Sequence, residues 1–220
     1  MIATERPTMA DAILHYIHDP LCGWCYAAEP LVQAVAAAGF PLVLHGGGLW
    51  DPASRSDATK RAYIRASDQR IATMTGQLFG AAYLDGLLAD PETVWWSRPT
   101  IAAVLAGEAI DGGSGLAMMS AIQRAHYVGG LRVVDADILV ATAIAAGFDG
   151  QHFAELLEQV PVDRHIAETR ALMLGRGLQG YPSFLLECDG ELAHVAHEAF
   201  YGRPEAFAAA LTAQALGVPV

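Results

Sequence analysis

The sequence lacks any long run of apolar residues. No window reaches the roughly 18 uninterrupted apolar residues that a membrane-spanning helix needs. Residues 1–10 also lack the apolar core of a secretory signal, and Met9 offers a second start site. As written, the sequence therefore predicts a soluble, cytoplasmic protein.

Positive charge is also scarce. Lysine and arginine together number 13 against 24 acidic residues, so the formal net charge is −11, and no basic run interrupts this balance. A surface of this sign repels phosphate groups, which makes nucleic acid and anionic membranes poor candidates for a partner. Only 17% of the residues are charged and 53% are hydrophobic, a composition that favours a folded chain with a substantial core.

Cysteine is rare, and its three positions are Cys22, Cys25 and Cys188. Three cysteines are too few, and odd in number, for a framework of disulfides. In a reducing compartment, two closely spaced cysteines indicate catalysis or metal binding instead of a structural bridge. Cys188 belongs to a strand-like run, and we expect it to be a small buried hydrophobic residue.

Strand and helix patterns alternate at the start of the chain. The run 12–18 predicts a strand, a helical stretch extends from Cys22 to Ala38, and 41–45 predicts a second strand. A strand, a helix and a strand within about 35 residues form a βαβ unit with a right-handed crossover.

The middle of the chain, residues 53–159, consists of helix-length segments with few strand signals, and helices are expected to start near residues 57, 97 and 135. A helix over 164–176, a hairpin of strands at 183–188 and 191–196, and a helix over 204–216 follow. The sequence therefore predicts an α/β domain formed by 1–52 and 160–220, interrupted by a helical insertion over 53–159.

The segment Cys22-Gly23-Trp24-Cys25 lies where the first strand meets the first helix. Positions i and i+3 of a helix share one face, so the two sulfurs have a spacing that a disulfide can bridge. At the helix start, unpaired N–H groups and the helix dipole favour an anion, so we expect the Cys22 thiolate to be the attacking nucleophile. Cys25, deeper in the helix, would then resolve the mixed disulfide by attacking the Cys22 sulfur.

Together with the preceding Asp19-Pro20-Leu21 and the distant Gly180-Tyr181-Pro182, this motif resembles the DsbA-like branch of the thioredoxin superfamily. The chain looks closest to the predicted cytoplasmic protein-disulfide isomerases, which neighbour the FrnE proteins and the 2-hydroxychromene-2-carboxylate isomerases. The resemblance covers about residues 12–50 and 164–216 by motif. It implies an α/β thioredoxin fold with a large inserted all-helical domain.

The resemblance also assigns roles to residues outside the cysteine motif. It implies that Pro182 is a cis proline that faces the cysteines, and that the backbone of Tyr181 is free to bind an extended substrate. Pro30 lies five residues after Cys25, where thioredoxins carry a proline that kinks the helix.

Further candidates come from residues near the two cysteines. Glu29 follows Cys25 by four residues, so it should project beneath the Cys25 sulfur and accept its proton, unless it is only a solvated helix glutamate. We expect Trp24 to expose its ring for contact with substrate. His18 and Asp19 either tune Cys22 electrostatically or face solvent at the strand end.

Trp95-Trp96 in the insertion has two interpretations as well. These rings either line the substrate face or pack in the core, and core packing is the default for large aromatic side chains.

Three functions compete at this point. The first is exchange of disulfides with protein or peptide thiols through Cys22 and Cys25. The second is a glutathione-dependent isomerase or kappa-class-like glutathione transferase, whose members typically hold a serine where this chain has Cys22. The third is a metal-binding module, but structural zinc takes four ligands and one Cys-x-x-Cys supplies two. We expect no metal and no cofactor beyond the redox-active Cys22–Cys25 disulfide, with glutathione left open as a co-substrate. The oligomeric state and the direction of exchange are not predicted.

Overall fold

The computed structural model describes residues 12–217. The first ten residues, on which the expectation of no secretory signal rests, lie outside this range. The strands are β1 (Ile13–His18), β2 (Leu42–Gly46), β3 (Ser54–Arg55), β4 (Val94–Trp95), β5 (Ser183–Cys188) and β6 (Glu191–His194). The helices are α1 (Gly23–Ala37), α2 (Ala58–Thr75), α3 (Ser97–Ile110), α4 (Ser114–Tyr127), α5 (Ala136–Ala145), α6 (Gly150–Gln159), α7 (Val162–Arg176) and α8 (Pro204–Ala215), with a π-helical turn η2 (Ala82–Leu87) and a 3-10 turn η3 (Glu198–Phe200).

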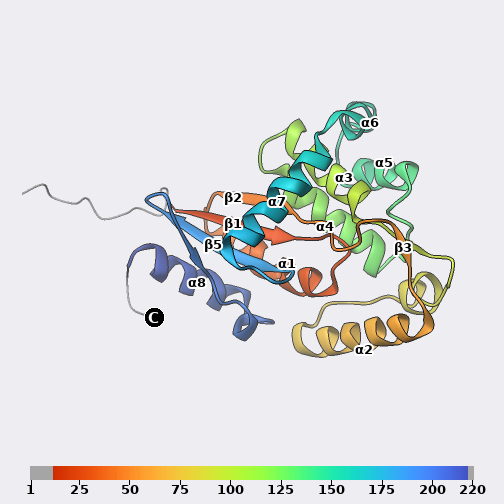
Figure 1. The fold of residues 1–220 in the computed structure, drawn as a ribbon, viewed down its shortest axis with the longest axis horizontal. Coiled ribbons are helices and arrows are strands. Elements are labelled where there is room, and N and C mark those ends of the chain that lie inside the picture. Colours follow the sequence, from red (N-terminus) through yellow and green to blue (C-terminus); the bar gives the residue numbers. More distant parts are fainter. Residues whose placement is uncertain (1–11, 218–220) are drawn as a thin grey trace, which may run out of the picture.

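A four-stranded sheet in the order β2-β1-β5-β6 forms the centre of the molecule (Figure 1). β1 pairs parallel with β2 and antiparallel with β5, and α1 makes the crossover, which confirms the predicted βαβ unit. The hairpin predicted between β5 and β6 is also present. Asp189 and Gly190 at its tip both have positive φ angles, of 52° and 78°, as a two-residue hairpin turn of this type requires.

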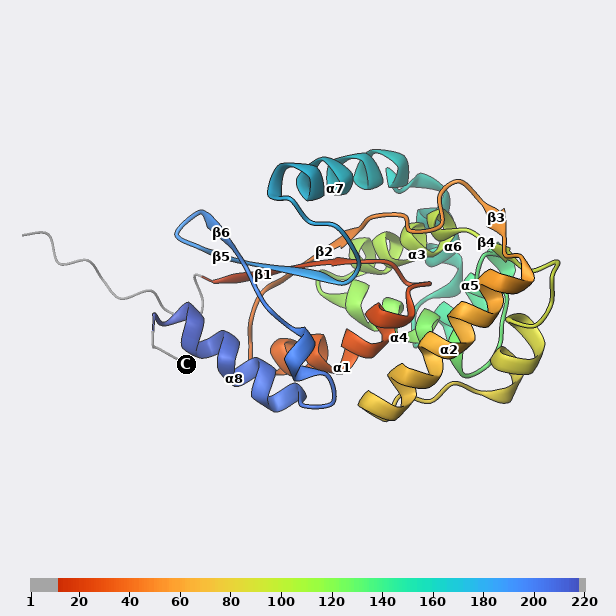
Figure 2. The same cartoon turned by 60° about the horizontal axis from the view of Figure 1, so that its bottom comes forward.

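The helices cover both faces of the sheet. α7 lies over one face, and α1 and α8 lie together under the other, as Figure 2 shows. α2 to α6 gather beyond the end of the sheet that is opposite the β5–β6 turn (Figures 1 and 2). The carboxyl end of β1 and the start of α1 therefore face the helical insertion.

The insertion begins at the predicted place. Asp57 caps α2 by accepting a hydrogen bond from the Lys60 N–H at 2.7 Å. A short antiparallel pair of β3 and β4 was not expected from sequence, because each strand has only two residues. The pairing places Trp95 next to Trp50, and the two rings stack with their centroids 5.2 Å apart. This stack lies beside the start of α1.

One hydrophobic core runs through the sheet and the insertion. Leu14 of β1 and Leu31 of α1 belong to the same buried cluster as Met118 of α4 and Phe153 of α6. The expected boundaries at 52/53 and 159/160 remain a prediction, but the two parts share apolar packing across them. Burial of this kind contributes roughly 25 cal/mol per Å² of apolar surface, so the insertion and the sheet stabilise each other.

Cys188 departs from its prediction. It is partly exposed instead of buried, because it is the last residue of β5 and lies beside the turn at Asp189.

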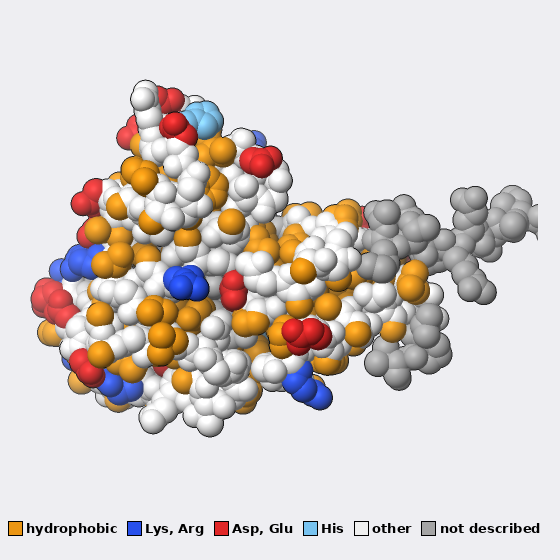
Figure 3. All heavy atoms as spheres, turned by 180° about the vertical axis from the view of Figure 1, so that it is seen from behind, with side chains coloured by type: hydrophobic (Ala, Val, Ile, Leu, Met, Phe, Trp, Pro, Cys, Tyr) orange, Lys and Arg blue, Asp and Glu red, His pale blue; other side chains and the backbone are white. Residues whose placement is uncertain are grey.

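The surface agrees with the composition. On the face seen in Figure 3, lysine and arginine side chains lie singly among acidic ones and form no basic patch. Within residues 12–217, no helix combines the length and the apolar character needed to cross a membrane.

Candidate active site

Cys22 occupies the N-cap position of α1, as the motif predicts. Its backbone is extended, and its side chain makes no capping bond to the helix amides. Instead the thiol donates a hydrogen bond to the carbonyl of Tyr181, with 3.5 Å between sulfur and oxygen. The side chain is only 6% exposed. Residues 159 positions apart in sequence therefore meet at the nucleophile.

Cys25 lies one turn deeper and is completely buried. Its sulfur accepts a hydrogen bond from the Asp19 N–H at 3.4 Å, and its carbonyl accepts one from the buried Tyr16 hydroxyl at 3.2 Å. Burial raises the pKa of the Cys25 thiol, and the hydrogen bond and charge of Cys22 and the charge of Asp19 raise it further. Cys25 is thus a protonated thiol that needs a proton acceptor before it can attack.

Asp19 is buried at the base of this turn and does not face solvent, which corrects one of the two expectations for it. Its carboxylate accepts the Leu21 N–H at 2.9 Å and the Leu49 N–H at 2.7 Å. Burial raises the pKa of Asp19, and these hydrogen bonds, a contact with Ser97 and the charge of Arg170 oppose the rise.

His18, the other residue expected at the strand end, is 1% exposed and stacks on Tyr16. Neither of its ring nitrogens has a hydrogen-bond partner among the described residues. Burial, assisted by the charges of His165 and His45, lowers the pKa of His18 to about 3, so the ring is neutral at pH 7.

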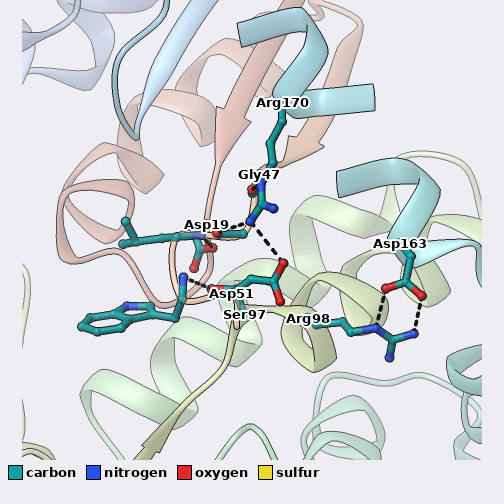
Figure 4. Close-up of polar contacts among 10 residues, drawn as sticks. Asp19, Gly47, Asp51, Ser97, Arg98, Asp163 and Arg170 are labelled. Carbon is teal, nitrogen blue, oxygen red and sulfur yellow. Dashed lines mark hydrogen bonds and ion pairs between the residues drawn. The ribbon is translucent and has the colours of Figure 1, made fainter. Parts of the chain in front are cut away.

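The loop after β2 is fixed from α7. Figure 4 shows Arg170 reaching the loop, where its guanidinium donates to the carbonyls of Gly47 and Gly48 at 3.0 and 2.9 Å and pairs with Asp51 at 3.2 Å. The same view shows Arg98 of α3 joined to Asp163 of α7 by two hydrogen bonds. α7 therefore holds the segment whose Leu49 N–H binds Asp19.

The peptide bond between Tyr181 and Pro182 is cis, which confirms the prediction for Pro182. A second cis proline, Pro52 after Asp51, was not anticipated. The Tyr181 ring packs closely on Gly47, and a Cβ atom at Gly47 would lie 2.1 Å from the Tyr181 hydroxyl oxygen. The absence of a side chain at position 47 therefore makes room for Tyr181, whose burial raises its pKa to about 12.

Two cavities open next to Cys22. A larger one of about 710 Å³ runs along Tyr181, Pro182 and Ser183 toward His197 and Tyr201. A smaller one of about 260 Å³ has Cys22 itself in its wall, together with Trp50, Lys60 and Asp68 from the insertion side.

Trp24 and Tyr181 contribute to the walls of both cavities, so they form a partition between them. The Trp24 ring is half-buried. Its centroid lies 5.4 Å from that of the Tyr201 ring and 5.3 Å from the guanidinium carbon of Arg70. Trp95 also lines the smaller cavity although it is only 2% exposed, so core packing and contact with the site coexist there.

The Glu29 carboxylate is bound by residues other than the cysteines. It accepts hydrogen bonds from Ser120 of α4 at 2.6 Å and from Gln33 at 3.0 Å. The structure therefore brings together Cys22, Cys25, Trp24, Tyr181 and Pro182, whereas the Glu29 carboxylate binds the insertion. Within residues 12–217, no group of three or more histidine, cysteine, aspartate or glutamate side chains is arranged to hold a metal ion.

Residues 14–212 match the DSBA-like thioredoxin domain. The chain belongs to this family. The α/β fold with its helical insertion is therefore a DsbA-like thioredoxin fold, as the motifs predicted. No curated protein matched the chain in the sequence comparison.

Solved structures of this family give a closer comparison. The chain is 43% identical to the cytosolic disulfide reductase DsbM from Pseudomonas aeruginosa, with a TM-score of 0.85 over 92% of this chain and 98% of that one. A second structure of DsbM, with GSH, matches at 40% identity and a TM-score of 0.84 over the same shares. A 2-hydroxychromene-2-carboxylate isomerase matches at 16% identity and a TM-score of 0.62, over 94% of this chain and all of that one, and shares the fold.

The sequence analysis did not identify several residues of this DsbA-like site. Asp68 carried a signal, because it lies between Ile64 and Ile71 at helical spacing and so interrupts the apolar stripe of α2 with an acid. Lys60 is the only lysine of the chain. Arg170 carried no local signal, since its partners lie more than 100 residues earlier.

Replacing Gly47 tests the packing of Tyr181. We expect Gly47→Ala to displace the Tyr181 ring and, with it, the carbonyl that contacts Cys22, which should lower kcat/KM for reduction of insulin on the order of tenfold. Gly175→Ala in α7 is the matched control, because no atom lies within 4 Å of the added methyl group. Equal activity of the two variants would show that the position of Tyr181 does not matter.

Proposed function

We propose that this protein is a thiol–disulfide oxidoreductase that exchanges disulfides with protein or peptide thiols through Cys22 and Cys25. The observation that carries this proposal is the placement of the pair. Cys22 lies at the tip of α1 in the wall of the smaller cavity, and the completely buried Cys25 lies one helical turn deeper. A glutathione-dependent isomerase has no use for a buried second thiol, so this arrangement favours exchange.

The reaction takes two steps with two electrons. The Cys22 thiolate attacks one sulfur of a substrate disulfide, a bond forms between them, and the second substrate sulfur leaves with the electron pair of the broken bond. Cys25 then loses its proton and attacks the Cys22 sulfur, which releases the remaining substrate thiolate. The substrate is reduced, and Cys22 and Cys25 end as a disulfide.

We assign the proton of Cys25 to Asp19 in place of Glu29. Asp19 is fully buried, it contacts the Cys25 sulfur through its own N–H, and its raised pKa makes its carboxylate a stronger base than an ordinary aspartate. A carboxylate has about four lone-pair sites, and Leu21, Leu49 and Ser97 occupy three of those of Asp19, so one remains for a proton. Glu29 is occupied by Ser120 and Gln33.

The substrate positions follow from the two cavities. We place an extended peptide in the larger one, along Tyr181 and Pro182, and a small thiol in the smaller one, with Trp24 between them. The similarity to DsbM, which is described as a cytosolic disulfide reductase and was solved with GSH, supports reduction as the direction, glutathione as the small thiol and a cytoplasmic location. Two glutathione molecules would supply the two electrons that restore the Cys22–Cys25 dithiol.

Substitution of each cysteine tests the exchange mechanism. We expect Cys22→Ser to abolish insulin reduction, and Cys25→Ser to accumulate mixed disulfides with cellular proteins, because the second step is blocked. Both variants are made in a Cys188→Ser protein, which alone is the control, since this third thiol lies on β5 outside both cavities. If no mixed disulfide is trapped by the Cys25→Ser protein on a non-reducing gel, the mechanism is wrong.

A second comparison separates the two candidate proton acceptors. In single-turnover reactions at pH 7, Asp19→Asn should slow resolution of the Cys22 mixed disulfide by about tenfold or more, because Cys25 loses its base. Glu29→Gln removes the same charge and should slow this step much less. If Glu29→Gln slows resolution more than Asp19→Asn does, the proton acceptor of Cys25 is Glu29.

Lys60 tests the glutathione assignment. Its ammonium group lies at the wall of the smaller cavity, 5.4 Å from the centroid of the Trp50 ring, and glutathione carries two carboxylates. We expect Lys60→Gln to raise the KM for glutathione about tenfold with little change in the rate of insulin reduction by dithiothreitol. Arg164→Gln on α7 removes the same charge outside the cavity and should leave both values unchanged. Equal effects of the two substitutions would show that only net charge matters.

A further inference from the structure

An acid of the insertion lies against the first turn of α1. Asp68 of α2 is 2% exposed, and one of its carboxylate oxygens accepts a hydrogen bond from the Tyr83 hydroxyl at 2.8 Å. The other oxygen faces Gly23, where a Cβ atom would lie only 2.7 Å from it. The residue directly after the nucleophile thus has no side chain, and the space beside it is filled by a carboxyl group.

This carboxyl group shares a cavity with the nucleophile. Asp68 and Cys22 both line the cavity of about 260 Å³, whose remaining wall is largely aromatic, including Trp50, Trp95 and Tyr127. The sulfur that departs from the attacked disulfide toward the insertion enters a space whose walls are mostly aromatic side chains. A thiolate is poorly stabilised there, because burial in low dielectric disfavours the charged form.

The surroundings of Asp68 leave about half of this carboxyl group protonated at pH 7 and most of it protonated at pH 6. Burial raises the pKa of Asp68 to about 7, and the Tyr83 hydrogen bond and the charge of Arg65 oppose the rise. Tyr83 of η2 and Tyr127 of α4 face it as neutral phenols, because burial raises the pKa of each. Arg65 itself is paired with Asp85, and Lys60 lies two turns earlier on the same helix. An ordinary alkyl thiol has a pKa of about 8.5, so transfer of a proton from Asp68 to such a thiolate is favourable.

We propose that Asp68 is a catalytic general acid, which protonates the sulfur that departs into the smaller cavity when Cys22 attacks a disulfide. The inference rests on the proposed exchange function and adds a residue of the insertion to it. The Cys22 sulfur forms the new bond, the departing sulfur takes the electron pair of the broken bond, and the Asp68 proton passes to that sulfur. The carboxylate then regains a proton from solvent, or takes it from an incoming thiol when the reaction runs in reverse.

The test compares two uncharged disulfides whose leaving thiols differ in acidity. The thiol released from hydroxyethyl disulfide is weakly acidic, so its sulfur needs a proton as it departs. The sulfur released from 2,2′-dipyridyl disulfide needs none, because its charge is delocalised onto the ring nitrogen, which takes a proton from water to give the thione. At pH 6, Asp68→Asn should lower kcat/KM for hydroxyethyl disulfide about 10- to 100-fold and change that for dipyridyl disulfide less than about twofold. Asp137→Asn, an exposed aspartate of α5 that does not line this cavity, should alter neither value.

The pH dependence supplies a second readout. The deficit of Asp68→Asn relative to the wild type should shrink as pH rises through about 7, because the wild-type carboxyl group loses its proton there. Tyr83→Phe removes a hydrogen bond that lowers the pKa of Asp68, so in this variant the acid form persists and the same transition should move to higher pH.

A thermal melt at different pH values checks that the Asp68→Asn protein is folded, because ionisation of Asp68 also affects stability. A folded-state pKa raised above the ordinary value gives stability at low pH that is lost as pH rises through about 7. The Asp68→Asn protein has no carboxyl group to ionise at this position and does not lose this stability, so at pH 8 its melting temperature should be no lower than that of the wild type. A variant that slows both disulfides equally, or whose deficit is independent of pH, overturns the role of Asp68. A wild-type protein that reduces neither disulfide contradicts the exchange function itself.

Discussion

The hydrogen bonds of Asp19 hold the site together. Its carbonyl accepts the Cys22 N–H, its N–H contacts the Cys25 sulfur, and its carboxylate binds the N–H groups of Leu21 and Leu49. One buried residue thus joins the end of β1, both cysteines and the loop after β2. A buried carboxylate is costly unless its oxygens are satisfied, and here two backbone N–H groups satisfy them. The position of the redox pair follows from that requirement.

A second layer of contacts holds the loop that Asp19 needs. Arg170 of α7 binds two loop carbonyls and Asp51, and Ser97 of α3 accepts the Trp50 N–H at 2.9 Å. The two anchors come from different sides of the molecule, α7 on the sheet and α3 in the insertion. The insertion therefore contributes to the support of the loop, in addition to part of the wall of the smaller cavity.

The sequence was informative where structure is local. The Asp57 cap and the Asp189-Gly190 turn each depend on a few adjacent residues, and the βαβ unit is formed by one continuous segment of the chain. All three were predicted. Family motifs located Tyr181 and Pro182, which no local pattern places next to Cys22.

The positions that the sequence left open share a physical cause. Helical spacing suggested Glu29 as the group beneath Cys25, but spacing says nothing about Ser120, which lies 91 residues later and binds that carboxylate. Asp19 and Asp68 are acids in apolar surroundings, and their burial depends on helices and loops that pack against them from distant parts of the chain. The role of Glu29 and the domain boundaries remain predictions.

The continuous core has a consequence for how the protein opens. Because side chains of β1, α1, α4 and α6 belong to one cluster, the insertion cannot swing away from the sheet as a rigid lid without breaking apolar contacts on both sides. In the proposed mechanism, substrates enter two cavities that are already present, and the geometry around Cys22 is set before they bind. An enzyme built this way selects a disulfide by the shape of its two halves, and little reorganisation is left to the encounter.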